Sequence, residues 1–144
     1  MRCDELMKCH VTTLAHDASV AEAARVMKEA GCGILPVCDS HGQVLGVLTD
    51  RDIVVRACSE GISLQETPAA EIMTRRLVTC APSDSVQAAE DLMMQHHKSR
   101  IIVTDAGRIA GVISLSDIAQ CEEPLRLSRV VREISSREFR VEHA

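Results

Sequence analysis

Hydrophobic and polar positions follow a pattern that occurs twice along the chain, in the same order. Shifting the chain by 66 residues superposes apolar, acidic and hydroxyl positions of one half on those of the other, and one extra residue near Ser40 then changes the shift to 65. An order kept over this length is typical of a duplicated unit. The matched segments include residues 5–7 with 71–73, 19–20 with 85–86, 46–47 with 111–112, and 52–53 with 117–118.

The first half of each copy predicts a strand followed by a helix. In the first copy, residues 11–14 form a short β-prone run. Ser19, with Glu22 three residues later, has the spacing of a capping box that opens a helix, and glycines at 31 and 33 close it. Apolar residues at i, i+3, i+4 and i+7 give this helix one buried stripe. The stripe residues are Val20, Ala23, Ala24 and Met27.

The second half of each copy predicts two antiparallel strands and a second helix. Residues 34–38 and 44–49 are apolar runs separated by a hairpin-type turn at 39–42, and a helix begins near Asp50. The second copy repeats this order. Its predicted elements are a strand at 77–80, a helix at 86–97, strands at 100–104 and 108–114, and a helix from Leu115.

A β-α-β-β-α unit of this size buries little of its own surface, so we expect the two copies to pack on each other. The predicted organisation is an α+β fold with a first repeat at 1–60, a linker at 61–70, a second repeat at 71–121 and a helical tail at 122–144. The tail has the pattern of an amphipathic helix whose arginines lie on a solvated face. Its apolar residues are Leu125, Leu127, Val130, Val131 and Ile134, and its arginines are Arg126, Arg129, Arg132 and Arg137.

Composition excludes several classes of function. The formal net charge of −5 lacks the positive charge that duplex DNA binding needs, and a single Phe with no Trp or Tyr removes the stacking platforms of single-strand binders. A bound base would therefore lie between aliphatic side chains. No apolar run approaches the roughly 20 residues of a membrane span, and the amino terminus lacks the apolar segment of a signal peptide. We expect no membrane partner and a cytoplasmic protein.

Seven cysteines occur without any C-x-x-C pair, so neither a disulfide framework nor a zinc ribbon is indicated. Most are expected to be small apolar residues. A thiol-responsive or metal-responsive sensor using Cys3, Cys9, His10 and the pair His96 and His97 has suitable ligand types without ligand spacing. It remains an alternative, and no metal site is predicted.

The two stretches that carry candidate chemistry are Gly46–Ile53 and Gly111–Ile118, each running from a strand into a helix. A hydroxyl residue followed three places later by Asp has a structural explanation as a helix cap. The functional interpretation is that a carboxylate one turn inside the helix accepts both hydroxyls of a ribose and that the helix start suits a phosphate. The two interpretations are compatible, and the occurrence of the motif in both copies favours the second.

The doubled motif G-h-h-[ST]-x-x-D-[IL], where h is apolar, together with Leu35-Pro36-Val37-Cys38-Asp39, resembles a tandem pair of cystathionine-β-synthase-type (CBS) domains over residues 5 to 121. The resemblance implies a pseudo-two-fold Bateman module that binds AMP, ADP, ATP or S-adenosylmethionine in clefts between its repeats. The second repeat departs from the family pattern in having Ile102 where Pro is common.

The resemblance assigns the site residue by residue. Asp52 and Asp117 become the acceptors of the ribose hydroxyls, Thr49, Ser114 and Ser116 lie beside ribose or phosphate, and Arg51 and Arg100 match basic positions that face phosphate. For both arginines an exposed salt bridge to a nearby acid is the alternative. The family pattern also implies that Cys32, Gly33 and Ile34 line the Asp117 cleft, and that Lys98, Ser99 and Arg100 line the Asp52 cleft.

No catalytic motif is present, so we expect a non-enzymatic sensor in which an adenosine-containing ligand shifts the packing of the repeats. Such a signal would pass to a separate effector protein, and the resemblance also implies a homodimer. The first alternative is a structural or adaptor protein that keeps the scaffold without binding a nucleotide.

Overall fold

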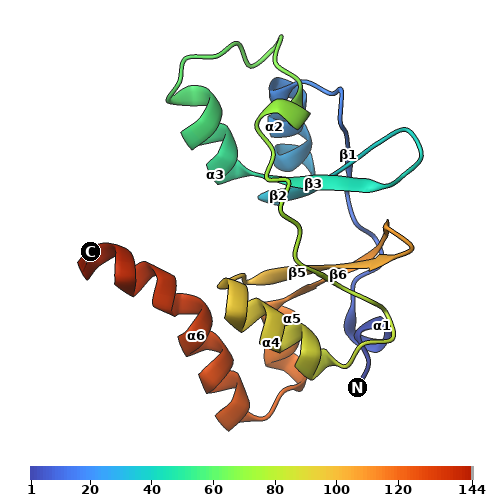
Figure 1. Cartoon of the computed structure of the whole chain (residues 1–144), viewed down its shortest axis with the longest axis vertical. Coiled ribbons are helices and arrows are strands. Elements are labelled where there is room, and N and C mark those ends of the chain that lie inside the picture. Colours follow the sequence, from blue (N-terminus) through green and yellow to red (C-terminus); the bar gives the residue numbers. More distant parts are fainter. Residues whose placement is uncertain (144) are drawn as a thin grey trace. The chain divides into compact units, whose positions relative to one another are not determined.

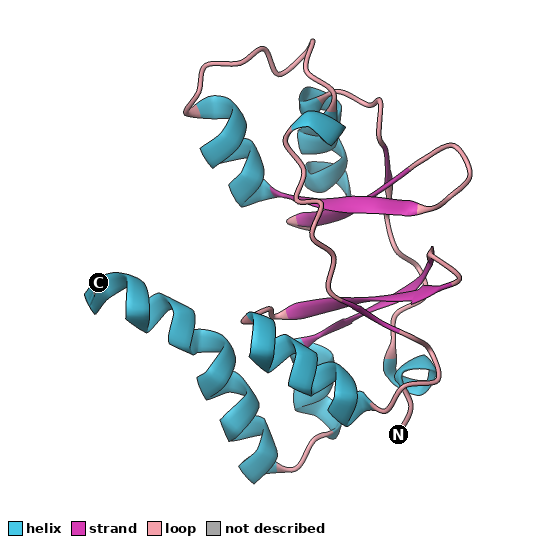
Figure 2. Cartoon of the chain, viewed as in Figure 1, coloured by secondary structure: helices cyan, strands magenta, loops and turns pink. Residues whose placement is uncertain are grey.

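The computed structural model describes the backbone of residues 1–143 and the side chains of residues 1–136. These residues form two compact units. Unit 1 comprises Met1–Val11, Val78–Ala106 and Ala110–Ala144, and unit 2 comprises Thr12–Leu77 and Gly107–Ile109. Each unit has helices gathered on one face of a three-stranded sheet, which confirms the expected α+β class (Figures 1 and 2).

Unit 2 contains the elements of the first repeat in the predicted order. Its sheet has the order β1-β2-β3, in which β1 is parallel to β2 and β2 is antiparallel to β3. The helix after β3 continues from an α-helical turn into a π-helix. The elements are β1 (Leu14–Ala15), α2 (Val20–Ala30), β2 (Ile34–Cys38), β3 (Val44–Thr49), α3 (Asp50–Asp52), the π-helix η1 (Ile53–Cys58) and the 3₁₀-helix η2 (Ala69–Glu71).

Unit 1 repeats this arrangement and adds a helix at each end. Its sheet has the order β4-β5-β6, with β4 parallel to β5. The elements are α1 (Cys3–Leu6), β4 (Thr79–Cys80), α4 (Val86–His96), β5 (Arg100–Asp105), β6 (Arg108–Ser114), α5 (Leu115–Cys121) and α6 (Pro124–His143).

The predicted boundaries are most accurate where local turn chemistry sets them. Strands β2, β3 and β6 match the predictions to the residue. The Ser19 hydroxyl caps α2 by accepting from the backbone N–H of Glu22, and Gly31 ends the helix with a φ of 65°. Strands β1 and β4 are two residues long, because each is defined by its pairing with the neighbouring parallel strand and not by its own apolar run.

The segment that leads into each repeat packs in the unit formed by the other repeat. In unit 1, Lys8 and Val112 exchange two backbone hydrogen bonds, and in unit 2 Thr74 and Val47 do the same. The N–H of Cys3 also donates to the Asp84 carbonyl at 2.8 Å. Unit 1 is therefore completed by Met1–Val11, which Thr12–Leu77 separate in the sequence from the rest of that unit.

This exchange explains the glycine near the middle of β6. A Cβ on Gly111 would lie 2.7 Å from Met7 Sδ and 2.9 Å from the Lys8 carbonyl oxygen. We expect Gly111→Ala to lower the free energy of unfolding by about 1–3 kcal/mol, because the backbone of the leading segment must move to admit the methyl group. Urea unfolding measures the loss, and an unchanged midpoint would contradict this close packing.

Two separate hydrophobic cores hold the units. The core of unit 2 lies between α2, η1 and its sheet, and that of unit 1 lies between α4, α5, α6 and its sheet. The fully buried large side chains are Leu35 and Leu48 in unit 2, and Met93, Ile101, Ile113 and Ile118 in unit 1. Val130 and Ile134 join the second core and Leu127 packs against it, whereas Leu125 and Val131 of the predicted apolar face are exposed.

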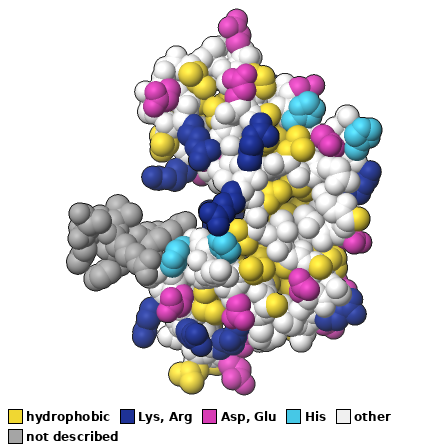
Figure 3. All heavy atoms as spheres, viewed as in Figure 1, with side chains coloured by type: hydrophobic (Ala, Val, Ile, Leu, Met, Phe, Trp, Pro, Cys, Tyr) yellow, Lys and Arg dark blue, Asp and Glu magenta, His cyan; other side chains and the backbone are white. Residues whose placement is uncertain are grey.

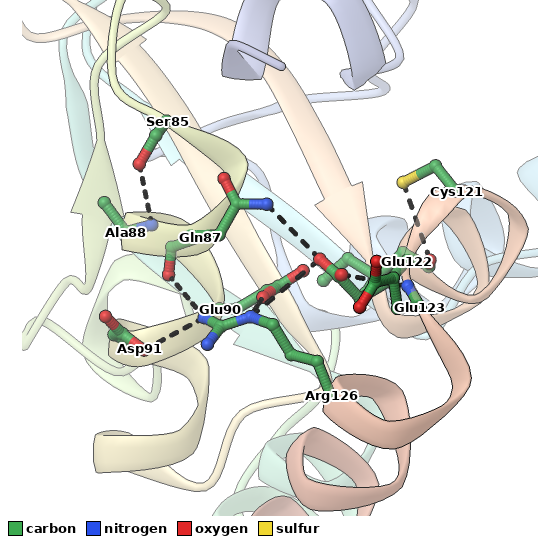
Figure 4. A network of polar contacts seen from close by, with 10 residues as sticks. Ser85, Gln87, Ala88, Glu90, Asp91, Cys121, Glu122, Glu123 and Arg126 are labelled. Atoms are coloured by element: carbon green, nitrogen blue, oxygen red, sulfur yellow. Dashed lines mark hydrogen bonds and ion pairs between the residues drawn. The ribbon is translucent and has the colours of Figure 1, made fainter.

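Helix α6 distinguishes the two units, because it packs on α4, whereas no helix among the described residues covers α2 in the same way. Glu90 of α4 is fully buried, whereas the matching Ala24 of α2 is exposed, contrary to its predicted place in the buried stripe. Arg126 of α6 donates through Nε to Glu90 Oε2 and through Nη2 to Asp91 Oδ1 at 3.2 Å (Figure 4).

The expectation of a solvated arginine face is therefore wrong for Arg126, whose side chain is 29% exposed and serves to pair a buried acid. Arg129 and Arg132 are exposed, as expected. The Arg137 side chain lies outside the described residues.

The surface in view carries acidic and basic side chains (Figure 3). Among the residues that the structure describes, no helix combines the length and apolar character needed to cross a bilayer.

Candidate ligand-binding site

The first candidate turn lies in unit 2, where β3 ends at Thr49 and α3 begins. Thr49 and Asp52 form a reciprocal capping box. Asp52 Oδ2 accepts from the Thr49 backbone N–H at 3.0 Å, and Thr49 Oγ1 accepts from the Asp52 N–H at 3.1 Å. The Thr74 hydroxyl lies 3.5 Å from the same carboxylate oxygen. The cap fixes the Asp52 side chain, which is 11% exposed.

The second candidate turn repeats this geometry in unit 1, where β6 ends at Ser114 and α5 begins. Asp117 Oδ2 accepts from the Ser114 backbone N–H at 2.8 Å and from the Ser114 hydroxyl at 2.7 Å. The predicted helix caps are thus present in both copies. In each copy the carboxylate presents its Oδ1 atom to a cation and not to the cap.

Different cations face the two carboxylates. Lys8 Nζ lies 3.0 Å from Asp117 Oδ1, and Arg56 Nε lies 3.7 Å from Asp52 Oδ1. Burial alone would raise the pKa of Asp117, but the hydrogen bonds from Ser114 and the nearby Lys8 ammonium outweigh it and lower that pKa. Asp117 is therefore ionised at neutral pH and ready to accept hydrogen bonds.

Several backbone N–H groups at the start of the two helices already have partners. Asp50 N donates to the Gly33 carbonyl at 3.0 Å, and Leu115 N donates to the Ser99 carbonyl at 2.8 Å. Arg51 N donates to Asp50 Oδ1 at 2.9 Å. A phosphate at these turns would consequently depend on side chains for much of its positive charge.

The predicted strand-edge residues lie next to the turn of their own unit. Cys32, Gly33 and Ile34 are half-buried at the start of β2. A Cβ on Gly33 would lie 2.8 Å from Asp50 Oδ2, so this position admits no side chain without movement of Asp50. In unit 1, Ser99 is half-buried, and Lys98 is exposed beside it before β5 begins.

The remaining predicted residues are on the surface. Arg51, Arg100 and Ser116 are exposed. In the portion of the chain with described side chains, neither Arg51 nor Arg100 forms an ion pair, so the salt-bridge alternative has no support for these two residues.

Sequence reasoning missed three residues that contact the carboxylates: Lys8, Thr74 and Arg56. Lys8 and Thr74 occupy matching positions under the shift of 66, directly after the aligned segments 5–7 and 71–73. The repeat therefore already indicated that these two positions are equivalent. Their contacts with the carboxylates depend on the exchange of leading segments, which brings each residue to the turn of the other repeat.

The cysteines form no candidate metal centre in the described region, where no three His, Cys, Asp or Glu side chains gather as metal ligands. Cys3 and Cys80 are buried with their sulfur atoms 3.8 Å apart, and burial raises the pKa of the Cys80 thiol to about 12. Such thiols are poor nucleophiles and poor metal ligands at neutral pH. Cys3, Cys38 and Cys80 are buried and Cys32 is half-buried, whereas Cys9, Cys58 and Cys121 are exposed.

Two sheets of matching order, each ending in a hydroxyl-acid capping box, define a tandem repeat of one small α+β domain. Residues 3–57 and 69–122 each match the family described as the CBS domain, and the chain belongs to this family. The CBS domain-containing protein YhcV of Bacillus subtilis is 36% identical over 115 residues, which cover 80% of this chain and 81% of that protein.

Two solved structures of similar fold contain adenosine compounds. The CBS domain protein PAE2072 from Pyrobaculum aerophilum, complexed with AMP, has a TM-score of 0.76 and 25% identity, covering 91% of this chain and 98% of that chain. The CBS domain pair of protein MJ0100, in complex with 5′-methylthioadenosine and S-adenosyl-L-methionine, has a TM-score of 0.73 and 25% identity. It covers 83% of this chain and 94% of that chain.

Proposed function

We propose that this chain is a non-enzymatic regulatory module that binds AMP, ADP, ATP or S-adenosylmethionine at its two hydroxyl-acid turns. The observation that carries the proposal is the doubled carboxylate. Asp52 and Asp117 are both largely buried, both held by a capping box through Oδ2, and both able to accept a ribose hydroxyl through Oδ1. Two relatives of the same fold bind adenosine compounds, which supports this ligand class.

The other ligand contacts follow from the positions of the predicted residues. In this proposal Thr49, Ser114 and Ser116 lie beside ribose or phosphate, and the exposed Arg51 and Arg100 supply positive charge. The half-buried strand edges hold the adenine, which agrees with the lack of aromatic side chains for stacking. The half-buried edge residues are Cys32, Gly33, Ile34 and Ser99, and Lys98 beside them is exposed.

The regulatory role follows from differential binding. A ligand that binds one arrangement of the chain better than another shifts the population toward it. The proposal includes a homodimer in the cytoplasm that passes this change to a separate effector protein. Val54 and Val55 of η1, 60% and 46% exposed, are apolar residues that such a dimer would cover.

A thermal unfolding series tests the ligand proposal against the adaptor alternative. AMP, ADP, ATP, S-adenosylmethionine and NAD are added separately to the purified chain. A ligand present at 100 times its dissociation constant is expected to add about 2.7 kcal/mol to the free energy of unfolding. Inosine monophosphate serves as a matched control for the purine base. Unchanged unfolding with every adenosine compound would contradict the proposal and favour the adaptor.

A further inference from the structure

Lys8 is held beside the Asp117 turn by the backbone and not by its own charge. Its N–H donates to the Val112 carbonyl at 2.9 Å and its carbonyl accepts from the Val112 N–H at 3.0 Å, two residues before Ser114. Its side chain is 70% exposed. The Lys8 backbone is anchored, and the exposed side chain places its ammonium group against the Asp117 carboxylate.

The Lys8 ammonium contacts the carboxylate oxygen that would accept a hydrogen bond from a ribose hydroxyl. Asp117 Oδ2 already accepts two hydrogen bonds from Ser114, while Oδ1 lies 3.0 Å from Lys8 Nζ. A hydroxyl directed at Oδ1 therefore competes with Lys8. The Lys8 side chain is 70% exposed, so water can solvate the ammonium when a ligand hydroxyl replaces it at Oδ1.

A displaced ammonium gains a new partner only if the ligand carries an anion near the ribose. The 5′-phosphate of a nucleotide is such an anion, whereas adenosine and its 5′-thioethers have none. The Leu115 N–H is already bonded to Ser99 and the Asp117 N–H to Ser114 Oγ, so side chains must provide most of the charge for a phosphate. Lys8 is the cation in contact with the Asp117 carboxylate.

At the Asp52 turn, the position that matches Lys8 carries no charge. Thr74 occupies the position that matches Lys8, and its hydroxyl is uncharged. Arg56 lies near Asp52, but its Nη1 donates to the carbonyls of Ile72 and Met73 at 3.1 and 3.2 Å. These bonds tether the guanidinium to the backbone, so it is not available to follow a phosphate.

We infer that Lys8 is a specificity-determining residue that makes the Asp117 turn favour adenosine compounds with a 5′-phosphate over those without one. This inference rests on the proposed function. A charge-assisted hydrogen bond of this kind corresponds to about a tenfold difference in affinity. The inference concerns the Asp117 turn alone, because the Asp52 turn has Thr74 in place of the lysine.

Calorimetric titration of AMP, adenosine and 5′-methylthioadenosine into the wild-type chain and Lys8→Met tests this inference. We expect Lys8→Met to weaken AMP binding about tenfold and to leave adenosine and 5′-methylthioadenosine unchanged or slightly tighter, because a competitor for Asp117 is removed. Lys8→Arg keeps the cation and should retain most of the AMP affinity. Lys28→Met removes one exposed lysine from α2 and is the matched control. Repeating the titrations in an Asp52→Asn background removes the contribution of the other turn.

The outcomes separate the two proposals. Equal weakening of AMP and adenosine in Lys8→Met, or AMP binding that does not change, would overturn the role of Lys8 while the proposed function stands. If no adenosine compound binds the wild-type chain, the proposed function fails and the inference fails with it. Thermal unfolding of the unliganded Lys8→Met variant verifies that the fold is kept.

Discussion

Replacing Arg126 with alanine is expected to lower the free energy of unfolding by about 3 kcal/mol at pH 8 and by about 1 kcal/mol at pH 5. Arg126 pairs with Glu90, a fully buried carboxyl of α4. Without the guanidinium, an ionised Glu90 is a buried charge with no opposite charge against it. Urea unfolding at the two pH values measures both losses.

The pH dependence follows from the shifted titration of Glu90. Burial, and then a hydrogen bond shared with the Glu122 carboxylate, raise the pKa of Glu90 from 4.5 to about 7, although Arg126 opposes the shift. Since the unfolded chain ionises first, the stability contributed by Glu90 is complete below about pH 4.5 and is lost as the pH rises to about 7. Removing Arg126 moves this loss to higher pH and enlarges it.

Two variants control this experiment. Arg129→Ala makes the same change at an exposed position of α6 and should cost little at either pH. Glu90→Gln has no proton to lose, so the difference in stability between wild type and Glu90→Gln should change between pH 5 and pH 8, even though histidines titrate in both proteins. A cost of Arg126→Ala that is the same at both pH values, or equal to that of Arg129→Ala, would show that Glu90 is not paired as described.

The hairpins of both repeats could be predicted from sequence because short-range chemistry defines them. The turn at Asp39 is held by its carboxylate, which accepts from the N–H groups of His41 and Gln43, and these bonds lower the pKa of Asp39. Ser19 and Ser85 likewise cap their helices through contacts three residues away. Signals of this kind are complete within a few residues.

The features that could not be predicted depend on contacts between distant segments. No local sequence pattern indicates that residues 1–11 complete unit 1, so the contact between Lys8 and Asp117 could not be predicted from the sequence. Glu90 could have been noticed, because it falls on the apolar stripe of α4 where the first repeat has Ala24. Its partner Arg126 could not be identified without knowing that α6 covers α4.

The candidate site likewise combines local contacts, which could be predicted, with contacts between distant segments, which could not. The capping boxes that fix Asp52 and Asp117 are local, so their geometry follows from the spacing of the hydroxyl and acid. The cations that face these acids come from other segments and differ between the repeats. The sequence therefore predicts two similar turns, and only the fold shows that their electrostatic surroundings are unequal.

Replacing Asp117 with alanine is expected to weaken binding of an adenosine ligand more than tenfold. The carboxylate is the proposed acceptor for the ribose hydroxyls, and a hydrogen bond to a charged group contributes about 1.5–3 kcal/mol. Asp117→Asn should have a similar effect with less disturbance of the turn, because the amide keeps one acceptor oxygen but loses the charge. Calorimetric titration with AMP and with S-adenosylmethionine measures the change.

The control must account for the structural role of Asp117, whose loss also removes half of a capping box. Ser85→Ala removes the N-cap of α4 in the same unit, at a cost of about 1 kcal/mol, and leaves the turn intact. If Asp117→Ala and Ser85→Ala lose equal stability but only the first loses affinity, the carboxylate binds the ligand. If the folded fraction of Asp117→Ala binds with the wild-type affinity, Asp117 is a helix cap alone, since a direct acceptor cannot be removed without loss of affinity.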